Sequence, residues 1–413
     1  MKVLYLCRLF SGFETSLVNK EWNPTGVPTI YKMIEAFDKS DHTMHFIMTN
    51  WGVGSNYESY ISDKNDQRIS LKGLKNPIQF IAGENRYPKR LGRFRAKFAD
   101  VRRVLVILKQ VYKFKPDIVY VDRSNLLSGA MISRLFNVPV VLRVMGVYPS
   151  MWDILKGKSL KNKLDRWAFR SPFKLVICTE DGSGGEKWMQ HALTSNVSRR
   201  MMLNGIAVSN ADSELPVELK ELNQSRLSVM FIGRLEKTKG CVQFVDALIK
   251  LYAEHNKNIT AIVIGAGLEK DNLIKKVEVA GAQSMFLFID RVPHSSIHAI
   301  HHYADVYVSL NQLGNLSNAN LECFYDGMCV IMPESQTGKG VDVSTDSLVP
   351  EDAVIRVPWE ALSDALADKI QMLLNDRKLC SQYGERIKQV SRTLLRSWDD
   401  RVSEELKILE NLD

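Results

Sequence analysis

The sequence is poor in cysteine and contains no C-x-x-C pair. The chain has six cysteines: Cys7, Cys178, Cys241, Cys323, Cys329 and Cys380. A chain of 413 residues buries enough apolar surface to fold without covalent cross-links. Zinc ribbons, in turn, need closely spaced cysteine pairs. We therefore exclude a disulfide scaffold and a zinc ribbon, and we expect a reducing, cytoplasmic location.

Long apolar runs are also absent. No run approaches the roughly 18 to 20 residues that a membrane-spanning helix needs. The first ten residues, MKVLYLCRLF, hold only the short apolar stretch VLYLC, and no small-residue cleavage site follows. We predict a strand there rather than a signal peptide, and no segment that is integral to a membrane.

Sequence motifs for several ligand classes are missing. The P-loop pattern G-x-x-x-x-G-K-[ST] does not occur, and VIGAGLEKDNL (263–273) has Lys270 where the third glycine of G-x-G-x-x-G would fall. No zinc finger, RNA-binding signature or basic zipper is present either. These absences argue against a P-loop nucleotidase and a nicotinamide dehydrogenase, and we expect no nucleic-acid partner.

The composition is that of a globular protein, and the length of the chain predicts two domains. The charge is divided unevenly between the two halves of the chain. Hydrophobic residues make up 45% and charged residues 25% of the chain. Residues 1–206 carry 33 Lys and Arg against 17 Asp and Glu, whereas residues 207–413 carry 22 against 30. Such asymmetry indicates different partners for the two halves.

The positive charge of the first half is concentrated in residues 85–115 and 155–170. The first stretch has eleven Lys and Arg against Asp100, and the second has six against Asp165. Aromatic residues lie between the cations in both stretches, as they do in helices that rest on anionic lipid. Each stretch alone also fits an ordinary helix with a solvated basic face. Together they predict contact with an anionic membrane surface or acceptor.

Short apolar runs bounded by polar residues predict two parallel α/β sheets. The predicted strands of the first half are 2–10, 43–50, 117–123, 139–146 and 174–180. Those of the second half are 226–235, 259–267, 285–290, 304–310 and 329–334. Helical patterns lie between the strands, which is typical of doubly wound Rossmann-like domains. The predicted domains are 1–206 and 227–388, with a linker at 207–226 and a final segment, 389–413, that returns to the first domain.

Two polar segments follow predicted strands of the second half, where open α/β sheets bind ligands. In FIGRLEKTKG (231–240), Arg234 and Lys239 precede a helix start and suit a diphosphate, although an exposed charged turn is the alternative. In GNLSNANLE (314–322), the Asn and Ser residues either cap a helix or bind sugar hydroxyls. Glu322 suits a vicinal diol, or it is a surface glutamate.

The order of these segments resembles the donor-binding half of the family 4 glycosyltransferases, which have the GT-B fold. The resemblance covers residues 227–376 through FIGRLEKTKG, VIGAGLEKDNL, FIDRVPHSSIHAIHHYADVYVSL and NLECFYDGMCVIMPES. The first half matches more loosely, through KVLYLCRLF, KPDIVYV, VPVVLRVMG and KLVICTE, and SWDD resembles the family's crossover. The resemblance implies two Rossmann-like domains that face a central cleft, with a C-terminal helix crossing back to the first.

The resemblance also implies roles for individual residues. Arg234 and Lys239 would stabilise the departing diphosphate, Glu322 would hold the ribose, and Val292 would lie beside the base. The implied donor site as a whole consists of Gly26, Gly233, Arg234, Lys239, Val292, Gly314, Asn315, Leu316, Ser317, Asn318 and Glu322. The family implies a UDP- or GDP-linked sugar as donor, retention of configuration, no metal and no cofactor.

Two positions depart from the family pattern. The first glutamate of E-x7-E falls at Gly314, where the family's carboxylate contacts the donor sugar; the amide of Asn315 or Asn318 would have to replace it. The family's His-Gly pair on the acceptor side falls at Met145 and Gly146, with Arg143 as a nearby source of charge. Because of these departures, the resemblance determines neither the identity of the donor sugar nor whether the protein catalyses transfer.

Three functions remain open from the sequence. The first is a hexosyltransferase that acts on a glycan or lipid-linked acceptor in surface polysaccharide or lipopolysaccharide assembly, peripheral to the cytoplasmic face of the membrane. The second is an inactive relative that binds nucleotide sugars as a sensor or partner subunit. The third is another GT-B activity on sugar nucleotides, such as a non-hydrolysing epimerase.

Overall fold

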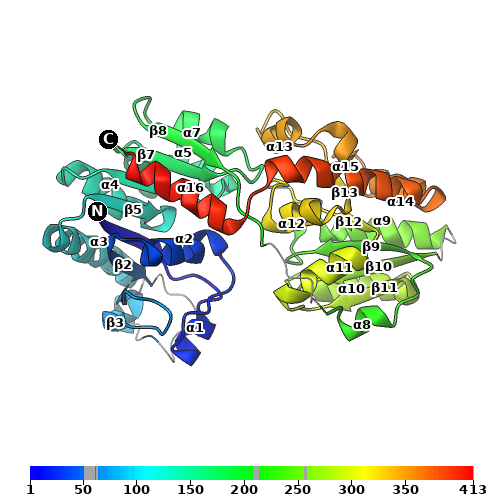
Figure 1. Cartoon of the computed structure of the whole chain (residues 1–413), viewed down its shortest axis with the longest axis horizontal. Coiled ribbons are helices and arrows are strands. Elements are labelled where there is room, and N and C mark those ends of the chain that lie inside the picture. The colour runs from blue at the N-terminus through cyan, green and yellow to red at the C-terminus, as the bar shows by residue number, and fades with distance from the viewer. Residues whose placement is uncertain (51–60, 62–63, 93, 208–213, 255–257, 413) are drawn as a thin grey trace. The chain divides into compact units, whose positions relative to one another are not determined.

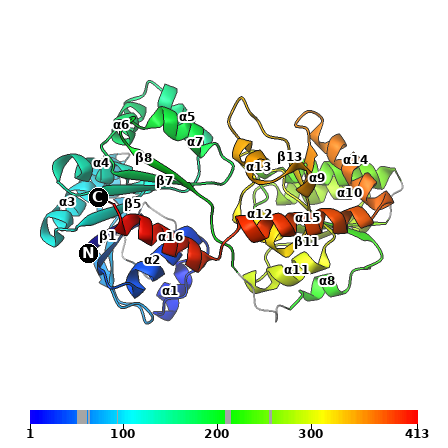
Figure 2. The same ribbon diagram turned by 45° about the horizontal axis from the view of Figure 1, so that its top comes forward.

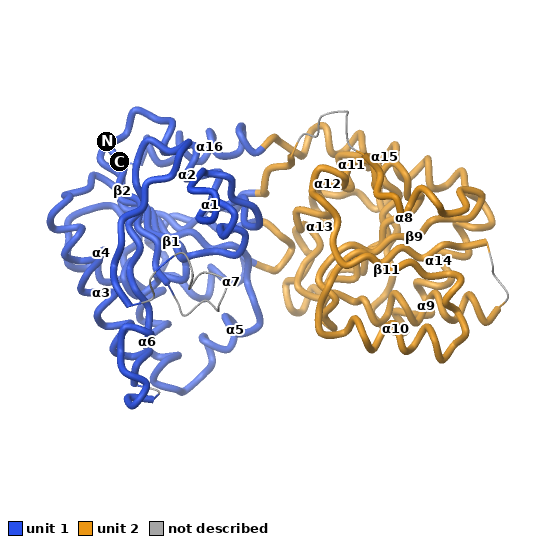
Figure 3. Tube along the Cα trace, turned by 90° about the horizontal axis from the view of Figure 1, so that it is seen from below, with its two compact units in different colours: residues 1–179, 185–202, 398–413 blue, residues 180–184, 203–397 orange. Residues whose placement is uncertain are grey.

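A computed structural model describes residues 1–50, 61, 64–92, 94–207, 214–254 and 258–412. Arg93 of the basic stretch and residues 208–213 of the predicted linker therefore lie outside the described residues. The chain forms two compact units, which Figure 3 distinguishes by colour. Unit 1 comprises Met1–Thr179, Gly185–Met202 and Trp398–Asp413, and unit 2 comprises Glu180–Gly184 and Leu203–Ser397.

Unit 1 is built on a sheet with the strand order β3-β4-β2-β1-β5-β6-β7-β8. Only the β3–β4 pair is antiparallel among these described strands. The strands are β1 Lys2–Arg8, β2 Thr43–Thr49, β3 Gln67–Ile69, β4 Ile78–Ile81, β5 Ile118–Asp122, β6 Val140–Val144, β7 Leu175–Thr179 and β8 Ser198–Met202. The helices are α1 Glu14–Asn19, α2 Pro28–Lys39, α3 Phe94–Phe114, α4 Leu126–Leu135, α5 Pro149–Lys156, α6 Leu160–Phe169, α7 Gly185–Ala192 and α16 Trp398–Glu410.

Helices cover both faces of this sheet because its central strands are apolar on both sides. Along β1, Val3 and Tyr5 belong to one core cluster and Leu4 and Leu6 to the other, as the two-residue period of a strand requires. The first cluster is closed by α1, α2 and α16, and the second by α3 to α7. Figures 1 and 2 show α16 running beside α2 on one side of the sheet.

Unit 2 repeats this plan with a parallel sheet in the order β11-β10-β9-β12-β13-β14. Its strands are β9 Leu227–Ile232, β10 Ile259–Ile264, β11 Phe286–Ile289, β12 Val306–Val308, β13 Cys329–Pro333 and β14 Ile355–Val357. Its helices are α8 Val217–Lys220, α9 Cys241–Ala253, α10 Lys270–Val279, α11 Ile297–Tyr303, α12 Asn318–Asp326, α13 Val343–Leu348, α14 Leu362–Asn375 and α15 Lys378–Leu394. Helices α9, α10 and α14 pack on one face, and α8, α11, α12 and α15 on the other.

The predicted α/β class with two Rossmann-like domains is confirmed, and each predicted strand lies on an observed one. The units change at Leu203, just before the predicted linker. Residues 389–394 belong to α15 in unit 2, so the helix that returns to unit 1 begins at Trp398. No helix among the described residues combines the length and the apolar character that crossing a membrane requires.

Arg143 lies in the interior of unit 1, which corrects its assignment to the acceptor side. Its side chain is 1% exposed. The guanidinium donates to the carbonyl of Val144 at 2.6 Å and to the Thr179 hydroxyl at 2.9 Å, and its Nε lies 3.6 Å from the Glu405 carboxylate. Regular alternation along β6 directs this side chain toward α16 and away from the end of the strand.

Glu405 on α16 is the carboxylate that balances two buried cations of unit 1, Arg143 and Arg401. It pairs with Arg401 of its own helix and with Arg143, and it accepts a hydrogen bond from the Tyr120 hydroxyl at 2.5 Å. Burial raises the pKa of Glu405, but Arg401 and Arg143 outweigh burial, and the pKa falls below its usual value. This network attaches α16 to unit 1.

We predict that Glu405→Gln lowers the free energy of unfolding of unit 1 by about 3–5 kcal/mol at pH 7, because two buried arginines lose their counter-charge. A depressed folded-state pKa stabilises the native state above the unfolded pKa, and this contribution is lost as the pH falls through the folded value. The difference between wild type and variant should therefore shrink in urea melts below about pH 4.5. The control Glu410→Gln, which removes an exposed pair with His42, should cost less than about 1 kcal/mol. Equal effects of the two variants would contradict the assignment.

Candidate functional site

The segments after β9 and β12 come together at the carboxyl edge of the unit 2 sheet. The N–H of Gln312 donates to the carbonyl of Thr238 at 2.9 Å. Gly240, which has φ +78°, precedes α9, and a Cβ there would lie 2.3 Å from the Cβ of Leu310. Glycine is therefore required where α9 begins, because any side chain would collide with the loop after β12.

Arg234 and Lys239 occupy this junction. Arg234 is 69% exposed, and its Nη1 lies 2.7 Å from Glu236. Lys239 is half-buried, and its ammonium has no hydrogen-bond partner among the described residues. Burial and then the charge of Arg234 lower the pKa of Lys239, whereas Glu236 and Asp181 act in the opposite sense. A partly desolvated ammonium beside an exposed guanidinium is suited to bind an anion.

The two glycines of VIGAGLEKDNL bring backbones together. A Cβ on Gly265 would lie 1.9 Å from the carbonyl oxygen of Gly233, and one on Gly267 would lie 2.4 Å from that of Leu235. The loops after β9 and β10 therefore pack backbone against backbone. This packing explains two glycines after a strand without a dinucleotide-binding function.

Gly314 stands where no side chain fits. Its φ is +120°, and a Cβ would lie 2.4 Å from the carbonyl oxygen of Asp181 and 2.6 Å from the nitrogen of Ser183. The N–H of Leu316 also donates to the Asp181 carbonyl, at 3.1 Å. The segment Glu180–Gly184 thus occupies the space that a glutamate at position 314 would need.

Asn315 is buried and bonded within unit 2. Its amide nitrogen donates to the Asp342 carboxylate at 2.6 Å and to the Asn311 carbonyl at 2.9 Å, and its amide oxygen accepts from the Ser309 hydroxyl at 2.8 Å. Its backbone N–H donates to Asp342 at 2.7 Å. The proposed replacement of the missing carboxylate by the Asn315 amide is therefore wrong, since that amide is enclosed and saturated.

The start of α12 keeps several backbone donors unsatisfied. Ser317 caps the helix and accepts from the N–H of Asn320. The N–H groups of Asn315 and Leu316 are used inside the unit, which leaves those of Ser317, Asn318 and Ala319 without an acceptor among the described residues. Such groups at a helix N-terminus are an anion-binding arrangement.

Two polar side chains flank these donors on α12. The Asn318 side-chain oxygen accepts from the Asn204 amide at 2.7 Å. Glu322 is 17% exposed and lies 3.6 Å from His294. Burial raises the pKa of Glu322 to about 7; nearby Asp326 adds to this, and His301 opposes it. A poorly solvated carboxylate of this kind gains by accepting hydrogen bonds from ligand hydroxyl groups.

The other predicted positions are distributed between the units. Val292 packs partly buried against the core of unit 2. Gly26, Met145 and Gly146 belong to unit 1. Gly26 has φ +90°, and a Cβ there would lie 2.1 Å from the Ser11 carbonyl oxygen, so the loop requires glycine. Met145 packs half-buried against the core of unit 1.

Asp181 and Asp342 are residues of this site that the sequence did not single out. Asp342 is buried with φ +58°, and its N–H donates to the carbonyl of Gly182 at 2.7 Å. One oxygen of Asp181 accepts from the N–H of Ser183 at 3.0 Å and from its hydroxyl. The other accepts no hydrogen bond from the described residues. Burial raises the pKa of Asp181. The run DGSGG (181–185), in which Gly182 and Gly184 have positive φ, was the available signal.

Residues 218–390 match the family described as Glycosyl transferases group 1. The chain is 26% identical over 200 residues to an uncharacterized glycosyltransferase of Methanocaldococcus jannaschii, covering 47% of this chain and 48% of that protein. It is 22% identical over 218 residues to the 2-deoxystreptamine glucosyltransferase of Streptomyces kanamyceticus, covering 49% and 54%. The chain thus spans about half the length of the curated relatives it matches.

Solved structures resemble the whole chain. Sucrose-phosphate synthase of Thermosynechococcus elongatus has a TM-score of 0.72 and 15% identity, with coverage of 100% of this chain and 99% of that one. HepE of Anabaena, in complex with UDP, has a TM-score of 0.67 and 16% identity, with coverage of 99% and 100%. The fold is that of the GT-B glycosyltransferases. The family match lies within unit 2, and at this level of identity the likeness to solved structures shows the fold.

We predict that Gly314→Ala destabilises unit 2 by more than about 2 kcal/mol, because positive φ and a backbone clash add together. Gly281→Ala is a matched control: its φ is +65°, but nothing lies within 4 Å of the added Cβ. The control should therefore cost only about 1–2 kcal/mol. Urea unfolding followed by a probe in unit 2 measures both. If the two variants are equally stable, the 180–184 segment does not fill the space beside Gly314.

Proposed function

We propose that this chain is a retaining glycosyltransferase that moves a hexosyl group from a UDP- or GDP-linked sugar to a glycan or lipid-linked acceptor. The proposed setting is surface polysaccharide or lipopolysaccharide assembly at the cytoplasmic face of a membrane, and the proposed transfer needs no metal. Unit 2 would bind the donor, and unit 1 would bind the acceptor.

The observation that carries the proposal is the position of Arg234 and Lys239. Both follow β9, and the Gln312–Thr238 hydrogen bond holds their loop against the segment that leads into α12. Two cations and the free N–H groups of a helix start are therefore contributed by adjoining loops. A diphosphate has the negative charge to pair with the two cations and the oxygens to accept hydrogen bonds from the N–H groups. The same groups would stabilise the negative charge that develops as the diphosphate leaves.

Glu322 completes the nucleotide half of the proposed site. It lies one turn into α12, after the unsatisfied N–H groups of Ser317 and Asn318. Its poorly solvated carboxylate would accept hydrogen bonds from the two ribose hydroxyls, and Val292 would lie near the base. Binding a diol compensates a carboxylate for its lost water, so this interaction favours the ionised form.

We further propose that Asp181 contacts the hydroxyl groups of the transferred sugar. Its backbone fills the space beside Gly314, and its charge acts on Lys239. A carboxylate repels phosphate oxygens, so one placed near a phosphate-binding lysine is better suited to neutral hydroxyl groups. Ser183 orients one oxygen of Asp181, and the second is available to a ligand. The carboxylate that is absent at position 314 would thus be supplied from position 181.

Helix α3 supports a membrane-facing role for unit 1. Its exposed apolar residues follow helical spacing along one stripe: Phe94, Phe98, Val101, Leu105 and Tyr112. Lys97 lies 5.6 Å from the centre of the Phe94 ring, and further lysines flank the stripe. Helix α6 likewise exposes Leu160, Leu164 and Trp167 among its basic residues. An anionic lipid surface suits apolar groups bordered by cations.

A binding protein without turnover is the second candidate. It is favoured by the internal use of the Asn315 and Leu316 N–H groups, which the family resemblance assigned to the donor. Such a relative would bind nucleotide sugars through Arg234 and Lys239 but would neither transfer nor hydrolyse them. Product analysis with the intact chain distinguishes the two functions.

We predict that Lys239→Ala weakens UDP or GDP binding by about 10- to 100-fold, since a charge-assisted hydrogen bond contributes about 1.5–3 kcal/mol. Arg234→Ala should act in the same direction. Glu322→Gln should weaken nucleotide binding but leave inorganic diphosphate unaffected. Isothermal titration measures these constants, with Lys276→Ala, an exposed lysine on α10, as control. Unchanged affinity in the Arg234/Lys239 double variant would overturn the site.

We predict that Asp181→Asn lowers the affinity for the preferred nucleotide sugar by about 10-fold but leaves that for the free nucleoside diphosphate unchanged. The exposed Asp364→Asn, which pairs with Lys250, is the matched control. The probes are UDP-glucose, UDP-N-acetylglucosamine and GDP-mannose beside UDP and GDP. Equal loss for sugar and nucleotide would contradict the sugar contact. Failure of the wild type to bind any of them would contradict the transferase itself.

We predict that the double variant Phe98→Glu/Leu105→Glu loses most of its sedimentation with phosphatidylglycerol vesicles, because two charges interrupt the apolar stripe. The wild type should sediment with these vesicles and not with phosphatidylcholine vesicles. Val279→Glu, at an exposed apolar position of unit 2, is the control and should behave as the wild type does. Equal sedimentation of all three proteins would rule out α3 as the lipid contact.

A further inference from the structure

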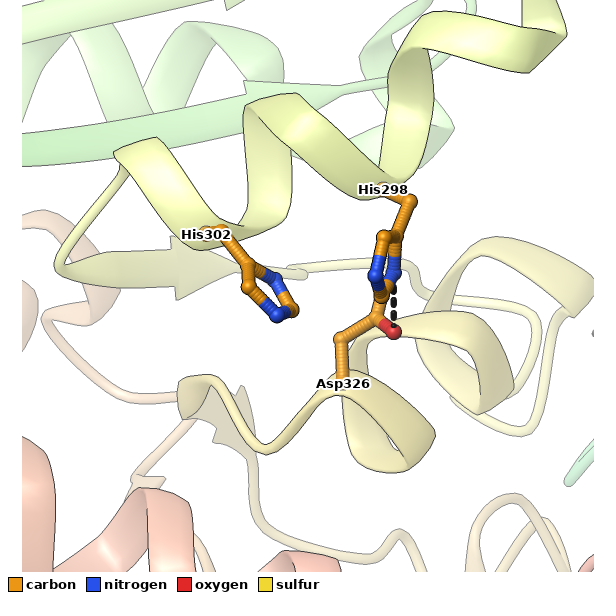
Figure 4. Close-up of side chains that lie close together, drawn as sticks. All are labelled: His298, His302 and Asp326. Carbon is orange, nitrogen blue, oxygen red and sulfur yellow. Dashed lines mark hydrogen bonds and ion pairs between the residues drawn. The ribbon is translucent and has the colours of Figure 1, made fainter. Parts of the chain in front are cut away.

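Three side chains of unit 2 outside the proposed donor contacts form a compact cluster of metal-ligand type. They are His298 and His302 on α11 and Asp326, the last residue of α12 (Figure 4). One potential ligand atom from each lies within 4.8 Å of the others. The two histidines are one helical turn apart, so their rings lie on the same face of α11, with centroids 4.3 Å apart.

The carboxylate of Asp326 is already oriented for such a role. Its Oδ1 lies 2.7 Å from Nδ1 of His298, and its Oδ2 lies 2.6 Å from Nδ1 of the buried His301. An ionised carboxylate only accepts, so His301 must carry its proton on Nδ1; its Nε2 then faces the Cys323 sulfur at 3.4 Å. In established metal sites, a neighbouring residue that donates a hydrogen bond to a ligating carboxylate fixes the orientation of that ligand.

We propose that His298, His302 and Asp326 bind a divalent transition cation of the zinc type, with solvent as the remaining ligand. Two imidazoles and one carboxylate are a common ligand set for Zn²⁺, whereas Mg²⁺ and Ca²⁺ prefer oxygen alone. With bonds of about 2.0–2.1 Å, tetrahedral ligand atoms lie roughly 3.3 Å apart. The observed ligand atoms lie within 4.8 Å of one another, so a bound cation would draw the side chains closer together.

The position of this site indicates a structural role. Asp326 is eight residues beyond Asn318, and at 1.5 Å per residue it lies about 12 Å from the start of α12. The cation is therefore too far from the proposed diphosphate site to act on the leaving group. It would join α11 to α12, which already pack together through Ile300, Leu321 and Phe324.

The test uses the full chain, freed of metal by a chelator and titrated with CoCl2 and ZnCl2. We expect one Co²⁺ per chain with the visible absorption of a four-coordinate site, displaced by Zn²⁺, and a rise in Tm with Zn²⁺ but not with Mg²⁺. His302→Asn should weaken binding by at least about 10-fold, because it removes a ligand but leaves both hydrogen bonds of Asp326 in place.

His191→Asn, on α7 of unit 1, is the matched control: its Nδ1 bonds only a carbonyl of its own helix in the structure. It should bind Co²⁺ as the wild type does. Unchanged Co²⁺ affinity in a folded His302→Asn protein would overturn the proposal, as would equal losses in both variants. The proposal does not depend on the transferase function, because the readout is metal binding alone.

Discussion

The buried carboxylate of Asp342 is the group on which the arrangement of the loops at the candidate site depends. It accepts from the backbone and the side chain of Asn315 and from the Thr345 hydroxyl, while its own N–H donates to the Gly182 carbonyl. Burial raises its pKa, and the bonds from Asn315 and Thr345 act against that rise. The side chain and the backbone of one residue therefore hold the 180–184 segment against the loop that enters α12. Loss of Asp342 would leave buried donors unpaired, at about 1–3 kcal/mol each.

Most of the fold could be predicted from the sequence because buried parallel strands are continuous apolar runs. Four of the described strands were not predicted. Strands β3 and β14 have three residues each, and the edge strand β8, SRRMM, is mostly exposed. Strand β4, IQFI, is apolar but has only four residues, too few to stand out in the sequence. The prediction that Arg143 lies on the acceptor side failed for a related reason. A charge in an apolar strand suggested a ligand contact, but its counter-charge, Glu405, is 262 positions away and became visible only with α16 in place. Local pattern cannot locate the partner of a buried ion.

The candidate site was predictable where its residues follow strands and not where distant segments meet. Arg234, Lys239 and Glu322 stand at recognisable positions, whereas Asp181 and Asp342 reach the site through a contact between the 180–184 segment and residues 311–317. The glycine at 314 appeared to be a missing carboxylate. The backbone of residues 181–183 excludes a side chain at this position, and in the proposed function the carboxylate of Asp181 takes the place of the missing one. A motif found in one segment of the sequence does not reveal a side chain that a distant segment brings to the same place.

Glu322 interacts electrostatically with Asp326 at the C-terminal end of α12. Burial is the first cause of its pKa of about 7, and the negative charge of Asp326 raises it further. A cation bound by Asp326 would cancel that repulsion and lower the pKa of Glu322. The ionised form, which accepts hydrogen bonds from a diol, would then be more populated at neutral pH. Since linkage is reciprocal, a ligand that requires ionised Glu322 would in turn bind the cation-loaded chain more tightly. The proposed metal site would thus act on the proposed contact between Glu322 and the ribose through charge alone.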